Sequence, residues 1–246
     1  MEAVSLSFFR FEGAVNRLWA FSQMQFARAP LRAMPGIGFF KLFGTGTGEG
    51  FTPIPNFGVY AILATWPSLD EAQSAVTEGA IFHRYRAHAA ESATVFLSAY
   101  ASRGQWDGGS PFAVSPLEEA PVPFAVLTRA TVNLRHLSAF WRHTPHVSAL
   151  VRAQNHMRFK MGMGEVPWVQ QVTFSIWDDP AAMQAFAYGQ GPHRGAVGGV
   201  RQGHWFREEL YARFRVLGWE GTWEGRAPLA GVGVDRPEIT HQAALA

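Results

Sequence analysis

The chain has 246 residues, of which 48% are hydrophobic and 16% charged, enough apolar material for a sizeable core in one large domain or two small ones. It contains no cysteine, which excludes disulfides, thiolate-ligated haem and cysteine-bound zinc or iron–sulfur clusters carried by this chain. The formal net charge is only +2 and the basic residues are dispersed, so we expect no nucleic-acid partner.

The N-terminal segment MEAVSLSFFRF has an acidic residue where a signal peptide needs a basic region, so we expect a cytoplasmic protein. The longest uncharged run, residues 50–69, has about the length of a membrane span. However, Pro53, Pro55 and Pro67 interrupt it, and its second half is typical of a strand. We therefore predict no transmembrane helix.

The sequence contains a weak internal repeat. Arg10 aligns with Arg129 and Lys41 with Lys160, each pair 119 positions apart (129 − 10 and 160 − 41). Later motifs keep their order: GTGE matches GMGE, ILATW matches TFSIW, and RGQWDG matches EGTWEG. Since Lys41 and Lys160 are the only lysines, the offset predicts that they occupy equivalent positions in two halves.

Both halves show the same order of expected elements. The second half predicts strands over 124–132, 158–164, 168–177 and 209–217, a helix after the first strand, and a helix that begins at Asp179-Pro180. This β-α-β-β-α-β order is the ferredoxin-like plan. Because one such half leaves a sheet face bare, we expect an α+β fold in which two tandem ferredoxin-like repeats form a fused dimeric α+β barrel.

The order of the motifs also sets the expected boundaries. We place the first repeat at residues 1–110 and the second, with the candidate site, at residues 121–225. Residues 226–246 show no periodicity and predict an irregular C-terminal tail.

Most catalytic fingerprints are missing: the glycine-rich GTGTGEG fits neither a dinucleotide-binding loop nor a P-loop, and G-x-S-x-G is absent. The segment that differs is AFAYGQGPHRGAVGG, residues 185–199. Its helix-like run ends at Gly189, and Pro192 places His193 at the start of a second, glycine-rich turn. Two interpretations stay open: a loop histidine between short helices, or an axial ligand of a haem iron.

Several motifs together strongly resemble the spheroidene monooxygenase family: GTGEGFTPIPN, VYAILATWP, QVTFSIWDD, FAY followed by His193, and WFREELYARF. The resemblance extends from about Ser5 to Gly225. It implies a haem-containing monooxygenase that introduces a keto group at C-2 of acyclic carotenoids, converting spheroidene to spheroidenone with O2 and electrons from reduced ferredoxin. His204 departs from the family pattern, in which glycine is expected before the Trp-Phe pair.

The implied chemistry agrees with the composition. An unactivated C–H bond next to a polyene requires an oxidant that no side chain supplies, so a cofactor must supply it. Without cysteine, the protein ligand of a haem iron would be His, Tyr or Met. Two successive hydroxylations at one carbon would give a geminal diol, which loses water to leave the ketone.

A second resemblance, to haem enzymes and haem-degrading monooxygenases of the same barrel plan, implies where the ligand lies. In those proteins a histidine on the helical segment after the third strand often binds iron. Trp177 ends that strand here, and His193 follows 16 residues later (193 − 177). We therefore predict His193 as the axial ligand beside Trp177, with His204 and then His156 as alternatives. The matching first-half histidine, His83, is expected to face solvent.

Three polar residues of the second half complete the candidate site. Arg129, Lys160 and Gln171 are expected on strands, from which they would face either the pocket or the outside. In the pocket, Arg129 and Lys160 would bind haem propionates, and Gln171 would donate a distal hydrogen bond during catalysis.

Two other functions remain open from the sequence. A cofactor-free or flavin-dependent oxygenase of the same barrel class would act on an activated, quinol-like substrate, and a non-catalytic carrier would hold haem or an apolar ligand without turnover. Because carotenoids reside in membranes, a chain without a span is expected to dock peripherally at the inner or intracytoplasmic membrane through apolar residues and arginines.

Overall fold

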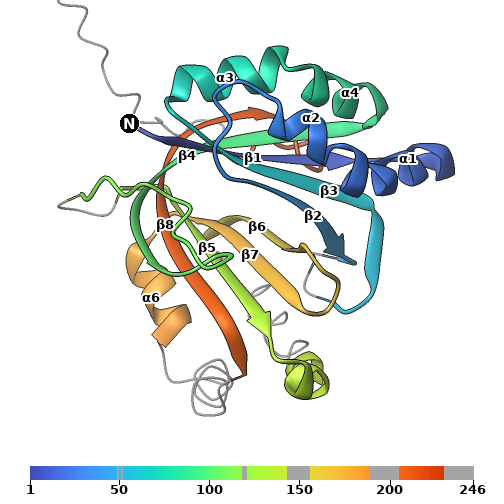
Figure 1. Cartoon of the computed structure of the whole chain (residues 1–246). Coiled ribbons are helices and arrows are strands. Elements are labelled where there is room, and N and C mark those ends of the chain that lie inside the picture. Colours follow the sequence, from blue (N-terminus) through green and yellow to red (C-terminus); the bar gives the residue numbers. More distant parts are fainter. Residues whose placement is uncertain (49, 51, 118–120, 143–155, 189–204, 230–246) are drawn as a thin grey trace, which may run out of the picture.

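A computed structural model of the chain describes residues 1–48, 50, 52–117, 121–142, 156–188 and 205–229 (Figure 1). Eight strands form a closed barrel in the order β1-β3-β2-β6-β7-β5-β8-β4. Each neighbouring pair of strands is antiparallel. The protein is therefore an α+β protein built on an eight-stranded antiparallel barrel. This confirms the α+β barrel that we expected from the sequence.

The elements follow one order in both halves. The first half contains β1 (Ala3–Arg10), α1 (Gly13–Phe26), α2 (Arg28–Arg32), β2 (Phe40–Gly46), β3 (Pro55–Trp66), α3 (Leu69–Glu78), α4 (Ala80–His88) and β4 (Glu91–Gly104). The second half contains β5 (Phe124–Val132), η1 (Leu134–His136) with helical residues 137–142 behind it, β6 (Met157–Gly164), β7 (Gln170–Trp177), α6 (Pro180–Tyr188) and β8 (Phe206–Gly221).

The barrel consists of two four-stranded parts. The first half-sheet has the order β4-β1-β3-β2 and the second half-sheet the order β8-β5-β7-β6. A long seam joins β4 to β8, from Ala93 opposite Gly221 to Gly104 opposite Leu210. A short seam joins β2 to β6, where Gly44 lies opposite Gly164.

The barrel interior is filled by side chains. Strand residues alternate, and the inward-facing set includes Leu210, Ala212, Phe214 and Val216 of β8, which confirms the strand predicted over residues 209–217. Large buried rings complete the interior, among them Phe8, Phe43, Phe159, Phe174, Trp106 and Trp223. An eight-stranded barrel is just wide enough for side chains to fill, and these buried residues make the interior a core.

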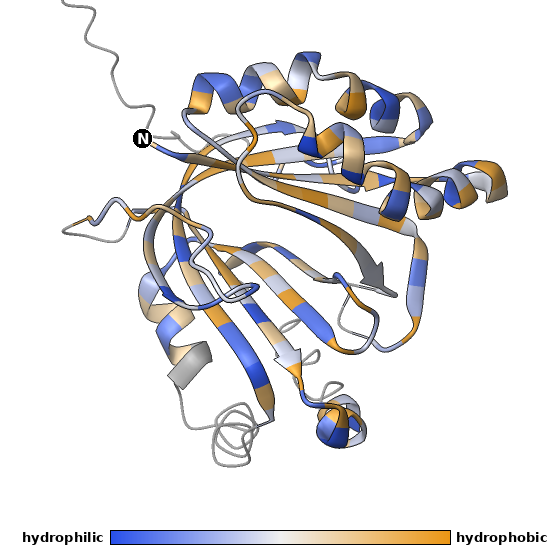
Figure 2. Cartoon of the chain, in the orientation of Figure 1, coloured by the Kyte–Doolittle hydropathy of each residue, from blue (hydrophilic) through white to orange (hydrophobic). Residues whose placement is uncertain are grey.

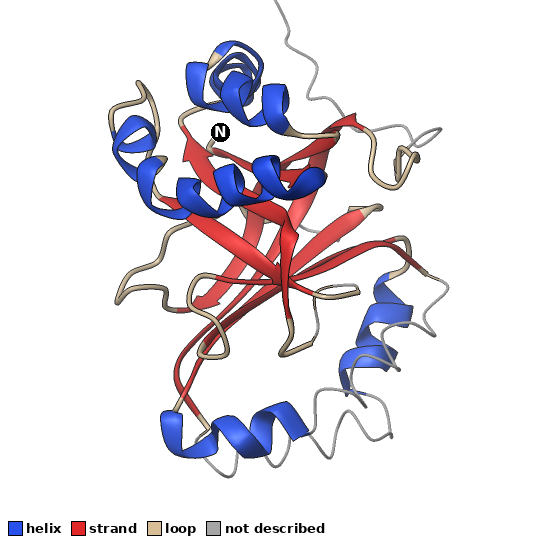
Figure 3. Ribbon diagram, turned by 90° about the vertical axis from the view of Figure 1, so that its right-hand side faces the viewer, coloured by secondary structure: helices blue, strands red, loops and turns tan. Residues whose placement is uncertain are grey.

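Helices cover the outside of the first half-sheet (Figure 3). α1 to α4 form a second core against the outer residues of β1 and β3. The largest contributors are Phe9, Phe11, Tyr60, Trp66, Phe82 and Tyr85. This half of the barrel is therefore closed on both sides.

The two lysines do not occupy equivalent positions, so this prediction from the constant offset is wrong. Lys41 lies opposite Leu63 of β3, which belongs to the barrel interior. Lys160 lies opposite Ser175 of β7, between the inward-facing Phe174 and Ile176, and thus faces outward. The physical reason is the period of a strand, because a shift of one residue moves a side chain to the other face.

Two short hairpins, residues 106–109 and 223–226, close the barrel; we call them the end plugs. An isolated bridge joins Trp106 to Gly109 in one and Trp223 to Arg226 in the other. The two central residues of each hairpin have positive φ, 54° and 76° in the first and 56° and 69° in the second. Positive φ at both positions defines the type I′ turn, which favours Asn or Asp followed by Gly; Asp107-Gly108 fits this preference, whereas Glu224-Gly225 keeps only its glycine.

An arginine of the opposite half holds the second plug. The Arg10 guanidinium lies 4.9 Å from the Trp223 ring centroid and 3.2 Å from the Glu91 carboxylate. Glu91 also accepts hydrogen bonds from the amides of Glu224 and Gly225. Burial alone would raise the pKa of Glu91, but these amides and Arg10 outweigh it and leave the pKa below its usual value.

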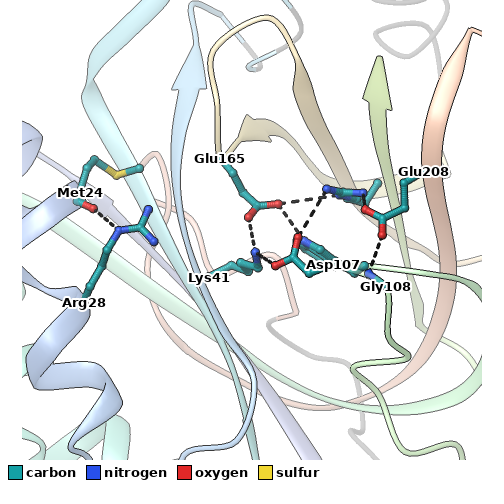
Figure 4. Close-up of polar contacts among 9 residues, drawn as sticks. Met24, Arg28, Lys41, Asp107, Gly108, Glu165 and Glu208 are labelled. Carbon is teal, nitrogen blue, oxygen red and sulfur yellow. Dashed lines mark hydrogen bonds and ion pairs between the residues drawn. The ribbon is translucent and has the colours of Figure 1, made fainter. Parts of the chain in front are cut away.

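The first plug is held in the same way from the second half. The Arg129 guanidinium lies 5.6 Å from the Trp106 ring centroid and pairs with Glu208, which accepts the Gly108 amide at 2.7 Å (Figure 4). Lys41 and Glu165, 2.5 Å apart, extend this cluster. The first plug follows β4 and the second plug follows β8. Because β4 and β8 are antiparallel neighbours, the two plugs lie at opposite ends of the barrel. The RGQWDG and EGTWEG motifs therefore encode one closing device that is used twice.

The expected irregular tail begins as packed chain. Leu229 is buried in the barrel interior, whereas residues 230–246 lie outside the described part. Across the described residues, no helix has the length and apolar character that a membrane crossing requires.

Candidate functional site

The outer face of the second half-sheet differs from its counterpart. We call it the second outer face. Its central residues on β5 and β7 are small and only half-buried, in particular Thr128, Ala130, Thr173 and Ser175. The first half-sheet has buried aromatic side chains in the same layer. Among the described residues, this face therefore offers more surface to a ligand than the outer face of the first half-sheet.

The register of the strands sets out three rows across this face. They are Lys160–Ser175–Val126–Arg213, Gly162–Thr173–Thr128–Tyr211 and Gly164–Gln171–Ala130–Glu209. Apart from Gln171, the side chains in the middle of the rows are small, and Lys160 and Arg213 lie at the two ends of the first row. Such a surface suits a broad, flat and largely apolar group that carries carboxylates, because cations meet the carboxylates at the edges.

Trp177 forms one end of the second outer face. It ends β7 as predicted, lies opposite Phe124 and packs with Met183 of α6. Its indole Nε1 donates a hydrogen bond to Ser175 Oγ at 2.8 Å. α6 begins after Asp179, whose carboxylate accepts the Ala181 amide at 2.7 Å, so the predicted helix start is confirmed.

Tyr100 adds a polar group at this end that sequence reasoning missed. It packs against the cluster of Phe124, Trp177 and Met183. Its hydroxyl is buried and has no hydrogen-bond partner within the described part of the chain. Burial raises the pKa of Tyr100, and the nearby Arg213 reduces the shift. An irregularity in β4 between Ala99 and Ala101 shifts the register at Tyr100, and no sequence pattern announces it.

The four predicted strand residues of the site do not all come together. Lys160, Gln171 and Trp177 lie on the second outer face, as the register shows. Arg129 is fully buried on the opposite side of β5, where it pairs with Glu208 and lies 3.8 Å from Glu165. Burial alone would raise the pKa of Glu208, but the Gly108 amide and Arg129 outweigh it and leave the pKa below its usual value.

The histidines fall into two groups. His193 and His204 lie outside the described residues, so their predicted role stays a prediction. His156 is exposed, and its carbonyl accepts the Asp178 amide at 3.0 Å. His83 of the first half is exposed as expected. Within the described ranges, no three His, Asp or Glu side chains form a group that could hold a metal ion.

His136 is a further histidine that sequence reasoning missed. It ends η1, behind β5, and its ring lies parallel to Trp205 with 5.7 Å between centroids. Its Nε2 is buried without a hydrogen-bond partner in the described residues. The signal in the sequence was weak, because His136 lies in an ordinary apolar helical pattern.

Comparison with known proteins identifies the family. No family model matches the chain, but it is 45% identical to the spheroidene monooxygenase of Cereibacter sphaeroides, over 100% of this chain and 76% of that protein. It is 44% identical to the spheroidene monooxygenase of Rhodobacter capsulatus, over 96% of this chain and 99% of that protein. The chain belongs to the spheroidene monooxygenase family. It is therefore a monooxygenase, a type of oxidoreductase.

A third member of the spheroidene monooxygenase family, from Rubrivivax gelatinosus, is 34% identical over 85% of this chain and 80% of that protein. Among solved structures, an aldoxime dehydratase superposes with a TM-score of 0.60 at 9% identity, over 87% of this chain and 81% of that one. At this identity the likeness shows a shared barrel fold.

Proposed function

We propose that this member of the spheroidene monooxygenase family introduces a keto group at C-2 of acyclic carotenoids, converting spheroidene to spheroidenone, on the second outer face. The names of the relatives support the substrate class. One observation carries the location: this face presents small, half-buried side chains between Lys160 and Arg213, whereas the first half-sheet is filled by helices.

We infer that the two halves are tandem ferredoxin-like repeats, at residues 1–110 and 121–225. The same strand order in both half-sheets supports this inference. The crossed end plugs support it further, since each repeat ends in the same Trp-acidic-Gly hairpin. The repeats have taken different roles, because in the described residues the helices fill the outer face of the first repeat much more completely than that of the second.

We propose haem as the cofactor, and the second outer face fits it. Lys160 would pair with the propionates at one edge of the face, while Val126, Thr128 and Ser175 leave a flat surface for the ring. We propose that His193 would bind the haem iron, with His204 as the alternative. When bound, the haem would supply the activation of O2 that insertion into an unactivated C–H bond requires.

The protein's own residues would position the substrate and control water. Gln171 lies in the row nearest the β6–β7 turn, where its amide would donate a hydrogen bond beside the reacting carbon. Trp177 and Phe124 close the other end of the face with apolar surface. Arg129 does not face this site, and we assign it to the first end plug.

The overall reaction balances as two hydroxylations. Each one consumes one O2, two electrons and two protons, places one oxygen atom in a C–H bond and releases one water. The second, at the same carbon, gives a geminal diol that loses water to form the ketone. We propose reduced ferredoxin as the electron donor and a cytoplasmic location with peripheral contact to the inner or intracytoplasmic membrane.

An absorption spectrum of the purified protein tests the cofactor. We expect a Soret band that shifts on reduction and again with carbon monoxide. His193→Ala should lose haem and recover part of the band with added imidazole, whereas His204→Ala and His136→Ala should keep it, with folding checked by circular dichroism.

Four outcomes would contradict parts of this proposal. Loss of the band in His204→Ala or His136→Ala, with His193→Ala unaffected, would reassign the ligand. A colourless protein that converts spheroidene would indicate a cofactor-free oxygenase, and one with a flavin spectrum a flavin-dependent oxygenase. A haem-loaded protein without turnover, given reduced ferredoxin and O2, would indicate a carrier.

A further inference from the structure

α1 exposes an apolar stripe to solvent. Val15, Leu18, Phe21 and Phe26 are 80%, 70%, 54% and 68% exposed, respectively. They share one side of the helix, while Ala20 on the other side is buried against the first half-sheet. α1 lies at the edge of the molecule, and hydrophobic residues recur along its length (Figure 2). Single exposed apolar residues are ordinary, but a continuous group marks an interaction surface.

The stripe continues onto neighbouring segments. The Phe21 ring contacts the ring of Phe57, 53% exposed, with 5.9 Å between centroids. Beside Phe57 along the chain, Ile54 is 63% exposed. Trp168 in the β6–β7 turn is 50% exposed, and its Nε1 donates a hydrogen bond to the Pro53 carbonyl at 2.8 Å. We call this surface the α1 patch; it consists of Val15, Leu18, Phe21, Phe26, Ile54, Phe57 and Trp168.

Trp168 is held in an unfavourable backbone conformation. Its φ is 64°, a region that bulky side chains rarely adopt. Two hydrogen bonds keep it there, one from Trp168 Nε1 to Pro53 and one from Trp141 Nε1 to the Trp168 carbonyl at 3.1 Å. The fold thus fixes a large indole at the surface, where it contributes little to the core. Trp is the residue that suits a boundary between water and lipid.

Along α1 and α2 the charge beside the α1 patch is positive, and the acidic residue nearest to these helices along the chain is Glu12, just before α1. Residues 13–48 contain no Asp or Glu. In this stretch Arg17, Arg28 and Arg32 are exposed. Arg28 is the first residue of α2, and its Nε donates a hydrogen bond to the carbonyl of Met24 in α1, with 2.9 Å between the two atoms (Figure 4). An apolar surface bordered by arginines is complementary to an anionic bilayer, whose headgroups attract the cations and whose acyl chains accept the apolar side chains.

We propose that the α1 patch docks the protein on an anionic lipid bilayer. The choice of lipid over a protein partner rests on the proposed function, because an acyclic carotenoid is dissolved in the membrane. The position agrees with this role. The Gly164–Gln171 row is the edge of the second outer face, and the turn that follows it carries Trp168. Docking through Trp168 therefore places this edge of the site at the bilayer.

Co-sedimentation of the full chain with carotenoid-free vesicles tests the proposal. We expect binding to phosphatidylcholine–phosphatidylglycerol vesicles that weakens in high salt and with phosphatidylcholine alone. Leu18→Ser/Phe21→Ser should reduce binding by about tenfold or more. Arg28→Gln/Arg32→Gln should reduce it by about tenfold in low salt, on anionic vesicles only.

The matched control is Val114→Ser/Val122→Ser. Both residues are exposed in the segment between the halves. Val122 lies just before the start of β5, which is opposite the last residue of β7 and therefore far from the β6–β7 turn. This variant should bind vesicles like the unmodified chain. The proposal is overturned if the unmodified chain does not bind, or if the Leu18/Phe21 variant binds equally well. If that variant instead turns a dimer into a monomer in sedimentation while vesicle binding is unchanged, the patch is an interface between two copies.

The same variants separate this proposal from the proposed function. The Leu18/Phe21 variant should still convert spheroidene presented in detergent at the unmodified rate, because the patch lies outside the second outer face. If the unmodified chain binds vesicles but never converts spheroidene, the proposed function fails and the docking surface stands.

Discussion

Arg129 and Lys160 show how the face of a strand decides the role of a cation. Both lie in the second half-sheet, and both were expected beside a cofactor. Arg129 points into the barrel, where it neutralises Glu208 and covers the Trp106 ring. Lys160 points to the second outer face beside Ser175. A buried guanidinium among carboxylates is part of the fold, whereas a half-buried ammonium at the edge of a small-residue surface is suited to a ligand.

We predict that alanine at position 129 affects the stability of the fold, whereas alanine at position 160 affects cofactor binding. Arg129→Ala should lower the free energy of unfolding by about 2–3 kcal/mol, because it leaves the half-buried Glu208 without its guanidinium partner and opens a void beside Trp106. Lys160→Ala should change it by less than about 1 kcal/mol and lower the haem content instead. Denaturant unfolding and the Soret absorbance measure the two quantities. Equal stability of both variants would contradict the assignment. Arg129→Met/Glu208→Gln should recover part of the stability lost in Arg129→Ala.

At the scale of elements, the end plugs depend on a particular turn. Asp107 and Glu224 adopt φ of 54° and 56°, and the following Gly108 and Gly225 have φ of 76° and 69°. A Cβ atom added at Gly108 or Gly225 would meet nothing within 4 Å. The requirement for glycine at these positions is therefore conformational and not steric.

Gly108→Ala and Gly225→Ala should each lower the free energy of unfolding by about 1 kcal/mol, because alanine disfavours positive φ. Gly109→Ala is the matched control, since Gly109 has ordinary φ and its nearest neighbour to an added Cβ is 4.0 Å away. Thermal or denaturant unfolding of the three variants measures the difference. If Gly109→Ala costs as much as the other two, the type I′ turns are not what stabilises the plugs.

At the scale of the whole molecule, both barrel ends share one electrostatic arrangement. Glu91 and Glu208 each accept plug amides and face an arginine from the same half, and each has a pKa below its usual value of 4.5. A carboxyl group with a lowered folded-state pKa contributes stability above its unfolded-state pKa, and this contribution is lost as the pH falls through the folded-state value.

We therefore expect the free energy of unfolding to fall as the pH decreases from about 5.5 through 4.5 and below. Glu91→Gln/Glu208→Gln should be less stable at pH near 7 and show a shallower decline with acid. Urea unfolding at a series of pH values provides the measurement. The prediction is wrong if the double variant keeps the full acid dependence.

The sequence predicted the order of the elements well, because the second-half strands carry clear β patterns and Asp179-Pro180 starts a helix as such pairs do. It predicted the face of a side chain less well. Arg129 and Lys160 were both placed beside the cofactor, but no repeat alignment resolves a shift of one residue, which reverses the face. Tyr100 depends on an irregularity in β4, and His136 depends on Trp205, which is distant along the chain. Contacts of this kind arise only after the barrel has closed.

The crossed plugs have a consequence for recombination between relatives. Arg10 and Glu91 of one half hold the hairpin of the other, and Arg129 and Glu208 hold the reciprocal hairpin. A chimaera joined between residues 110 and 121 would combine two plug–arginine pairs of mixed parentage, one at each end of the barrel. A chimaera joined between residues 88 and 91 would instead take β4, the first plug and the whole second half from the second parent. The first plug and Arg129 would then come from the same parent. Inheritance of the two halves is thus coupled at both barrel ends, although the three residue rows of the second outer face come from one half alone.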